Sequence, residues 1–459
     1  MSISQLASKN GRRYLEYKGK PQMLYGVQLK LGDLNVIEDV AEREREIENH
    51  FRMSAVCHFP IVCVPVNWKG HIEPALCAGT DCDFVKKCLS YCDKYDLSIQ
   101  WLWFGSNVCG MQVNVPQDIW DDAETYPRYT ENGENLLTVD HPNFIAREKK
   151  ALEYFLDMLD RLDVNRKTSA IQVENEPDFY AWHTQRDRRQ KVIDELGKTV
   201  KNSNFKVMTR VNLTAPRTYL GEDPVIDEIL DLDGIDCVGV DVYINEVSYC
   251  TDFSDNMNAR ARDKNLPHFA ELGANVDVLP QLICDTVQRG GGVLLYELKT
   301  ARKYNNGPFD FGLYRFSPNE WVERDGTVPV QYQWTEGIMV PEANTADIIS
   351  LNEMFKIVNE PLATAPIDNI AMILSGEERK LSDVNVSFVT AETGPNAFGM
   401  AVVGDDGYLY CFTLADGTFT VSGTDIKCAQ IYDYNVWKEA SVLDLKLDAK
   451  RGCVYRISL

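Results

Sequence analysis

The stretch PNFIAREKKALEYFLDMLDRL at residues 142–162 is followed, after a short connection, by SAIQVENEP at residues 169–177. In the first segment apolar residues recur at helical spacing behind a proline, which suits the first turn of a helix. The second segment is an apolar run that ends on Glu174-Asn175-Glu176. A helix that leads into a buried strand is the repeating unit of a parallel α/β fold.

The same alternation runs from about residue 20 to residue 340. Short apolar runs of β type alternate with helical patterns, which is typical of βαβ units. Eight such units favour an α/β fold of the (β/α)8 TIM-barrel type over an open doubly wound sheet, although periodicity alone is compatible with both. The predicted strands are Met23–Leu29, Ile61–Val66, Ser98–Phe104, Ala170–Glu174, Lys206–Asn212, Ile235–Tyr243, Val293–Glu297 and Gly312–Phe316.

The pattern changes after Pro361 and Pro366, where short alternating runs are separated by Gly and Asp turns. This indicates a small antiparallel β domain. We therefore expect a catalytic barrel over residues 1–360 and a C-terminal β-sandwich domain over residues 365–459. The long segments 105–141 and 245–273 are predicted as loops at the carboxyl ends of the strands, where barrels carry their active sites.

Charge and composition limit the classes of partner that the protein is expected to bind. Lys plus Arg total 47 and Asp plus Glu total 69, which gives a net charge of −22 and argues against nucleic acid or an anionic membrane as a partner. No apolar run of about 18 residues predicts a membrane span, and the first residues lack a secretory pattern. Many of the thirteen cysteines lie in apolar runs, as reduced thiols do. We expect a soluble cytoplasmic protein.

A metal site is the alternative for one cysteine group. Cys77, Cys82, Cys88 and Cys92 lie within sixteen positions and could in principle bind zinc. They contain no CxxC pair, and Cys88 and Cys92 have the spacing of residues on the buried face of a helix. The six histidines form no HxH or HExxH motif. We expect neither a metal nor an organic cofactor.

Two strand ends carry carboxylates. Glu176 follows the fourth predicted strand, and Glu297 ends the seventh. Retaining glycoside hydrolysis needs one carboxyl that protonates the leaving oxygen and another that attacks the anomeric carbon, roughly 5 to 5.5 Å apart. Strands four and seven of a barrel can provide such a pair at its mouth.

These residues carry a resemblance to a known family. Glu176 and Glu297 match the strand-four and strand-seven pattern of clan A glycoside hydrolases, and Gln172-Val173-Glu174-Asn175-Glu176 is similar to the acid/base motif of family 35, the β-galactosidase family. Further similarity lies in Asn67-Trp68 and in Trp101-Leu102-Trp103-Phe104-Gly105. The resemblance implies that Glu176 is the acid/base and Glu297 the nucleophile.

The resemblance also implies roles for neighbouring residues. Asn175 would bind the sugar 2-hydroxyl, and Tyr243 would contact the nucleophile, a core tyrosine being the alternative. The aromatic residues Trp68 and Trp103 lie near strand ends, where their rings could stack on a sugar. Substrate-binding roles are also predicted for Glu174 and Asn67.

One difference from family 35 bears on which sugar the protein recognises. Many family 35 enzymes carry Cys-Ala-Glu-Trp in the loop after strand three, whereas this chain has Gly105-Ser106-Asn107-Val108-Cys109-Gly110. The sequence therefore predicts a retaining, exo-acting β-glycosidase whose partner is a glycoside or oligosaccharide, with β-galactosidase as the first reading. A β-glucosidase or other β-hexosidase is the enzymatic alternative, and a non-catalytic sugar-binding barrel is the other.

Overall fold

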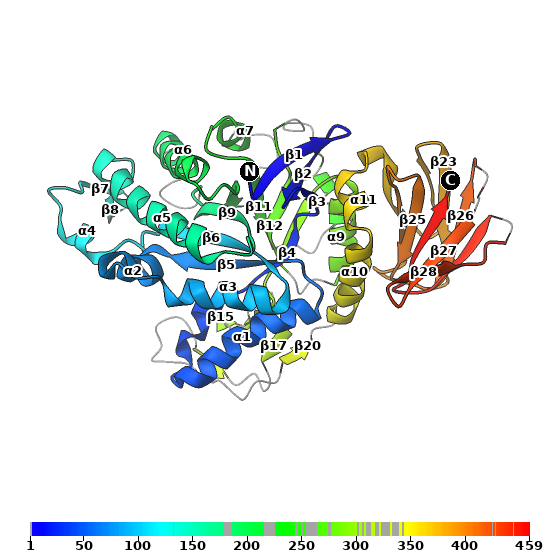
Figure 1. Ribbon diagram of the computed structural model, residues 1–459, viewed down its shortest axis with the longest axis horizontal. Coiled ribbons are helices and arrows are strands. Elements are labelled where there is room, and N and C mark those ends of the chain that lie inside the picture. Colours follow the sequence, from blue (N-terminus) through cyan, green and yellow to red (C-terminus); the bar gives the residue numbers. More distant parts are fainter. Residues whose placement is uncertain are drawn as a thin grey trace.

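The computed structural model describes residues 2–178 except 110 and 132, 186–214, 225–243, 264–273, 277–300 and 344–459 except 425, 427 and 444, with short segments within 247–255 and 303–341. Within them the chain forms a closed barrel of eight parallel strands, followed by two antiparallel sheets (Figure 1). The predicted (β/α)8 barrel with a C-terminal β-sandwich is confirmed.

The strands follow one another around the barrel in chain order, and each pairs in parallel with its neighbours. Almost every strand residue is buried, as expected where helices cover the outside and side chains fill the inside. The eight strands are β4 (Tyr25–Gln28), β5 (Ile61–Asn67), β6 (Ser98–Val108), β9 (Thr168–Asn175), β10 (Met208–Thr214), β11 (Cys237–Val242), β12 (His268–Gly273) and β13 (Gly292–Tyr296).

Two of the predicted strands were placed wrongly. The seventh strand is β12, which lies inside the segment predicted as a loop, so the run Val293–Glu297 belongs to the eighth strand, β13. Of the predicted strand Gly312–Phe316, residues Tyr314–Phe316 form β17, which pairs with β14 (Lys299–Thr300) and β20 (Met339–Pro341) outside the barrel. β12 is hard to recognise because polar residues interrupt its apolar run and its register shifts against both neighbours.

Helices cover the outside of the barrel. The predicted helix 142–162 is α5 (Pro142–Leu162), and its Phe155 packs against the outward-facing Trp101 and Trp103 of β6, with ring centroids 5.6 and 6.0 Å apart. None of the described helices has the length and apolar character needed to cross a membrane. The others are α1 (Val40–Val56), α2 (Glu73–Ala78), α3 (Asp83–Tyr95), α4 (Gln117–Asp121), α6 (Arg186–Asn202), α7 (Val225–Leu230), α9 (Leu279–Gln288), α10 (Thr345–Ile357) and α11 (Asn359–Thr364).

The barrel interior changes from apolar to polar along its axis. At the amino-terminal end Leu15 of the hairpin β2 (Arg12–Tyr17) and β3 (Lys20–Gln22) packs with Leu24, Ile61 and Leu294. The next layer is polar, and the fully buried Arg210 donates from Nε to Oε1 of Gln100 over 2.9 Å. The carboxylates lie beyond this layer, at the carboxyl ends of the strands.

The C-terminal domain packs on the barrel through α10 and α11, which lie between them in Figure 1. Along strand β24 (Phe398–Val403), Met400 faces the core shared with the barrel, whereas Ala401 faces the core between the two antiparallel sheets. Phe355 of α10 meets Phe412 of β25 (Tyr408–Thr413) edge to face at 6.1 Å. The larger sheet is β21 (Ile370–Leu374), β24 (Phe398–Val403), β25 (Tyr408–Thr413), β30 (Val454–Ser458), β27 (Cys428–Asp433) and β28 (Val436–Glu439); the smaller is β22 (Glu378–Leu381), β23 (Val384–Val389), β26 (Gly417–Ser422) and β29 (Lys446–Ala449).

Candidate active site

The end of β9 places its polar residues in different environments. Glu174 and Asn175 close the strand, and Glu176 follows directly. Glu174 and Glu176 adopt left-handed backbone conformations, with φ of 60° and 47°, which residues other than glycine seldom adopt. Glu174 and Asn175 are buried, whereas Glu176 is half-buried. Of the two glutamates, only Glu176 is open to a ligand at the barrel mouth.

Glu174 holds the end of the neighbouring strand β6. Its Oε1 accepts hydrogen bonds from the backbone N and the Oγ of Ser106, at 3.2 and 2.9 Å, and its Oε2 accepts one from the backbone N of Asn107 at 2.7 Å. Glu174 has no exposed surface. The structure therefore gives Glu174 a supporting role and does not place it where it could bind a sugar hydroxyl, as the sequence had suggested.

A second buried glutamate, Glu148 of α5, accompanies Glu174. Its Oε1 accepts hydrogen bonds from Nε1 of Trp103 and the backbone N of Ser106, both at 3.0 Å. Burial raises the pKa of both carboxyls, and the neighbouring Glu148 raises that of Glu174 further. We expect the pair to keep one proton at neutral pH. Gly105 leaves room for it, since a Cβ there would lie 1.9 Å from Oε1 of Glu148.

Glu176 is anchored through its backbone. Its N donates to Oδ1 of Asn212 on β10 over 3.2 Å, and its carbonyl accepts from Nδ2 of Asn107 at 3.5 Å. Its carboxyl lies close enough to Asp241 of β11 and to Cys109 to raise the pKa of both groups. Burial, followed by the charges of Glu271 and Glu176, holds the pKa of Asp241 well above its ordinary value. Asp241 is therefore expected to be protonated while a neighbouring carboxylate is charged.

Asn212 connects three strands at this level. Besides Glu176, its Oδ1 accepts from Nε2 of Gln172 at 2.8 Å. Its Nδ2 donates to Oδ2 of Asp241 at 2.7 Å and to Oδ1 of Asn175 at 3.1 Å. The network fixes the position of the backbone that carries Glu176, and it requires the Asn175 side chain to present its Nδ2 toward the mouth.

The third acid at the mouth is Glu271 on β12, which is 7% exposed. The hydroxyl of Tyr243 donates a hydrogen bond to its Oε2. Burial and the charge of Glu176 raise the pKa of Glu271 to about 7, against the lowering effects of the Tyr243 hydrogen bond and the charge of Lys30. Near neutral pH this carboxyl therefore exists in both charged and neutral forms.

Glu297 follows β13, the eighth strand, and is 4% exposed. The sequence had placed it on strand seven, a position that Glu271 occupies instead. The preceding Tyr296 contacts the Tyr243 ring edge to face at 5.5 Å, so β13 borders the same mouth. Glu176 and Glu271 are thus the acids on strands four and seven.

The predicted stacking platforms are not at the surface. Trp68 and Trp103 are fully buried, and Nε1 of Trp68 donates to Oε2 of Glu73 at 2.9 Å. Neither ring can stack on a sugar in this structure, because helix α5 and its neighbours cover both. Asn67 is half-buried at the end of β5, where its backbone N donates to Nδ1 of His71 at 3.1 Å.

Sequence reasoning missed Asn212, Asp241 and Glu271. Asp241 had a usable signal, since it alternates with Val240 and Val242 along a buried strand and so must face the barrel interior. Glu271 had a weaker one, a single acid between the apolar residues Ala270 and Leu272. Within the described part of the chain, no group of three His, Cys, Asp or Glu side chains has an arrangement that could bind a metal ion.

Comparisons with known proteins give distant likenesses. Residues 190–339 match the model of a domain of unknown function, DUF4978, and no curated protein matches. The chain is similar to the exo-β-1,4-mannosidase Op5Man5 from Opitutaceae bacterium strain TAV5 (13% identity, TM-score 0.48, 65% of this chain and 55% of that one). It is also similar to a Bacteroides uniformis β-glucuronidase, with 10% identity and a TM-score of 0.48 over 97% of this chain and 48% of that one. A third similar structure is the family 30 subfamily 8 xylanase Xyn30A from Clostridium acetobutylicum, with 11% identity and a TM-score of 0.46 over 99% of this chain and 97% of that one.

The chain spans about half the length of the first two of these proteins. At such identities and TM-scores the likeness is too distant to indicate which substrate this chain acts on.

Proposed function

We propose that this protein is a retaining β-glycosidase in which Glu271 is the nucleophile and Glu176 is the acid/base. The observation that carries the proposal is the position of the two acids on the fourth and seventh strands of one closed barrel, at the carboxyl ends. The two acids lie close enough for the charge of Glu176 to raise the pKa of Glu271. A carboxyl pair in this relation is what double displacement requires.

The environments of the two acids suit different roles. Glu271 receives the Tyr243 hydroxyl, which stabilises its charged form and directs one oxygen, leaving the other to attack the anomeric carbon. Glu176 is the more exposed of the two, as a group that must reach a leaving oxygen and later a water molecule has to be. When Glu271 is esterified it loses its charge, and Glu176 then acts as the base for the second step.

Asn175 is proposed to bind the sugar 2-hydroxyl. Its Oδ1 is occupied by Asn212 and Gln172. Its Nδ2 is 3.5 Å from Sγ of Cys109, a weak contact that a sugar hydroxyl could replace with a stronger one. Such a bond gains strength as positive charge develops at the anomeric centre.

The sugar specificity is a further proposal, with an exo-acting β-galactosidase first and a β-glucosidase or other β-hexosidase second. The galactoside assignment rests on the resemblance of residues 172–176 to family 35. Ser106 and Asn107, which lie where that family reads galactose hydroxyls, are buried and bound to Glu174. Other residues must therefore recognise the sugar.

A panel of chromogenic β-glycosides, with the α-anomers beside them, tests the proposal. We expect the protein to hydrolyse at least one β-hexoside and to release the β-anomer first, which proton NMR can monitor. We also expect the Glu271→Gln variant to lose turnover. The variant Glu353→Gln, which changes an exposed acid on α10, is the control. Binding of a sugar without turnover of any glycoside would instead support a sugar-binding barrel, and release of the α-anomer would contradict a retaining mechanism.

A further inference from the structure

We propose that a cavity at the amino-terminal end of the barrel binds an organic phosphate of monosaccharide size. The cavity has a volume of about 530 Å³, which is within the range of small-ligand sites. Its lining includes Met23, Pro60 and Lys167, which lie just before the first residues of β4, β5 and β9, respectively. The cavity is thus at the opposite end of the barrel from Glu176 and Glu271, and the proposal is independent of the glycosidase reaction.

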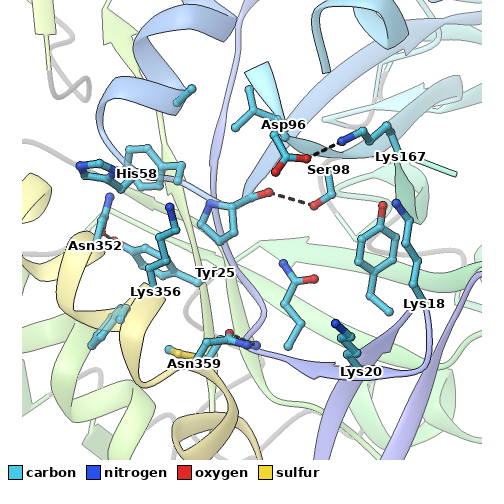
Figure 2. A pocket seen from close by; sticks show the side chains of 18 of the residues that line it. Lys18, Lys20, Tyr25, His58, Asp96, Ser98, Lys167, Asn352, Lys356 and Asn359 are labelled. Carbon is cyan, nitrogen blue, oxygen red and sulfur yellow. Dashed lines mark hydrogen bonds and ion pairs between the residues drawn. The ribbon is translucent and has the colours of Figure 1, made fainter. Parts of the chain in front are cut away.

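The cavity concentrates positive charge in an acidic chain. Lys18 and Lys20 enter from the hairpin between β2 and β3, Lys167 from the segment before β9, and Lys356 from α10 (Figure 2). Among the described lining residues, four lysines stand against a single carboxylate, Asp96. The net charge of the whole protein is −22, so a local excess of cations on this scale marks a surface that attracts anions.

The lysines are close enough to act on one another. Asp96 pairs with Lys167 at 2.7 Å, and its pKa is lowered first by that lysine and further by the charges of Lys18 and Lys356. The pKa of Lys18 is lowered by burial and then by repulsion from Lys167. The carboxylates Asp163 and Asp93 also act on Lys18, but among the described lining residues only Asp96 is acidic. A dianion with several acceptor oxygens could therefore still contact the four lysines of the cavity.

Three residues of the rim hold unusual backbone conformations. Lys18, His58 and Asp96 have φ of 51°, 60° and 53°, in the left-handed region that favours glycine or asparagine. Lys18 precedes Gly19 in the hairpin turn, a position normally taken by Asn, Asp or Gly. Asp96 and His58 lie at the C-terminal ends of α3 and α1, where a left-handed residue commonly ends a helix. All three residues line the cavity with polar side chains.

Polar groups in the cavity walls already have hydrogen-bond partners within the protein, and the walls suit an organic group. Tyr25 donates its hydroxyl to Oδ1 of Asn352 at 2.6 Å, and Ser98 donates its Oγ to the carbonyl of Pro60 at 2.9 Å. Tyr25 and Phe59 pack with ring centroids 5.7 Å apart. These walls offer rings and fixed dipoles to the body of a ligand, while the lysine ammonium groups would contact its phosphate.

The test is isothermal titration of the full chain with glucose 6-phosphate, glucose and inorganic phosphate at one ionic strength. The double variant Lys18→Gln/Lys356→Gln removes two cations from opposite sides of the cavity. The control, Lys86→Gln/Lys438→Gln, removes two exposed lysines elsewhere that pair with Asp83 and Asp433. Circular dichroism checks that both variants are folded, as expected for substitutions of exposed side chains.

We expect glucose 6-phosphate to bind the wild type and the control alike, with binding to the cavity variant weakened by at least about tenfold. Glucose should show no binding, and inorganic phosphate should bind more weakly than the sugar phosphate. Equal binding to the cavity and control variants, or the absence of any binding by the wild type, would overturn the site. Equal affinity for inorganic phosphate would overturn the organic part of the assignment.

Discussion

The hydroxyl of Tyr243, which follows β11, donates a hydrogen bond to Oε2 of Glu271 on the neighbouring strand β12. Tyr243 is 39% exposed at the barrel mouth, whereas Glu271 is 7% exposed. A phenol that bonds a buried carboxylate favours its charged form. The contact therefore helps to keep Glu271 ionised in a place where burial and Glu176 both oppose ionisation.

Tyr243→Phe should move the acidic limb of the pH profile. The pKa of Glu271 is raised from 4.5 to about 7, and only the ionised form can attack, so kcat/KM should fall as the pH falls through about 7. Loss of a hydrogen bond to a charged group, about 1.5 kcal/mol, should raise that pKa by roughly one more unit. The limb is read from kcat/KM between pH 5 and 9. An unmoved limb with uniformly lower kcat/KM would mean that Tyr243 does not act on the titrating group.

Glu271→Gln should stabilise the fold at alkaline pH. The raised pKa means that the folded state holds the proton more tightly than the unfolded state, so wild-type stability is lost as the pH rises from about 4.5 through about 7. An amide carries no such penalty, and we expect a gain on the order of 2 kcal/mol at pH 8 with little change at pH 4. Urea unfolding at the two pH values measures it. An equal gain at both would show that the effect is not electrostatic.

Glu174→Ala should destabilise the protein by about 2–4 kcal/mol, because the backbone N–H of Asn107 and the hydroxyl of Ser106 would lose a buried acceptor. Glu174→Gln keeps an acceptor oxygen and offers its amide to Glu148, so it should cost clearly less. Denaturant unfolding of the two variants gives the comparison. Similar losses in both would indicate that the charge of the pair, and not its hydrogen bonds, supports this end of β6.

Glu176→Ala should affect substrates according to their leaving groups. Aryl glycosides with a good leaving group, such as dinitrophenolate, need no proton in the first step, so glycosylation should be preserved, whereas poor leaving groups should be slowed by roughly 10²-fold or more. Azide should restore turnover and yield a β-glycosyl azide. Equal slowing of all substrates without azide rescue would remove Glu176 from the role.

Much of the architecture can be predicted from the sequence. The amphipathic helix 142–162 and the apolar strand that follows it are α5 and β9 of the structure, and the acid predicted at the end of that strand does reach the barrel mouth. Local periodicity suffices there because each element buries one continuous apolar surface.

The seventh strand could not be read in the same way. His268 and Glu271 are buried inside β12, so the strand lacks the uninterrupted apolar run by which a parallel strand is recognised. Missing it shifted the count by one and directed attention to Glu297. Trp68 and Trp103 show the complementary difficulty: a strand-end tryptophan can face the ligand or a covering helix, and only the three-dimensional packing distinguishes the two.

Covalent trapping tests the central assignment most directly. A 2-deoxy-2-fluoro β-glycoside of the preferred sugar, with a good leaving group, should inactivate the enzyme with one equivalent of label, and peptide mapping should find that label on Glu271. Label on Glu297 would contradict the account and make the acid of the eighth strand the nucleophile.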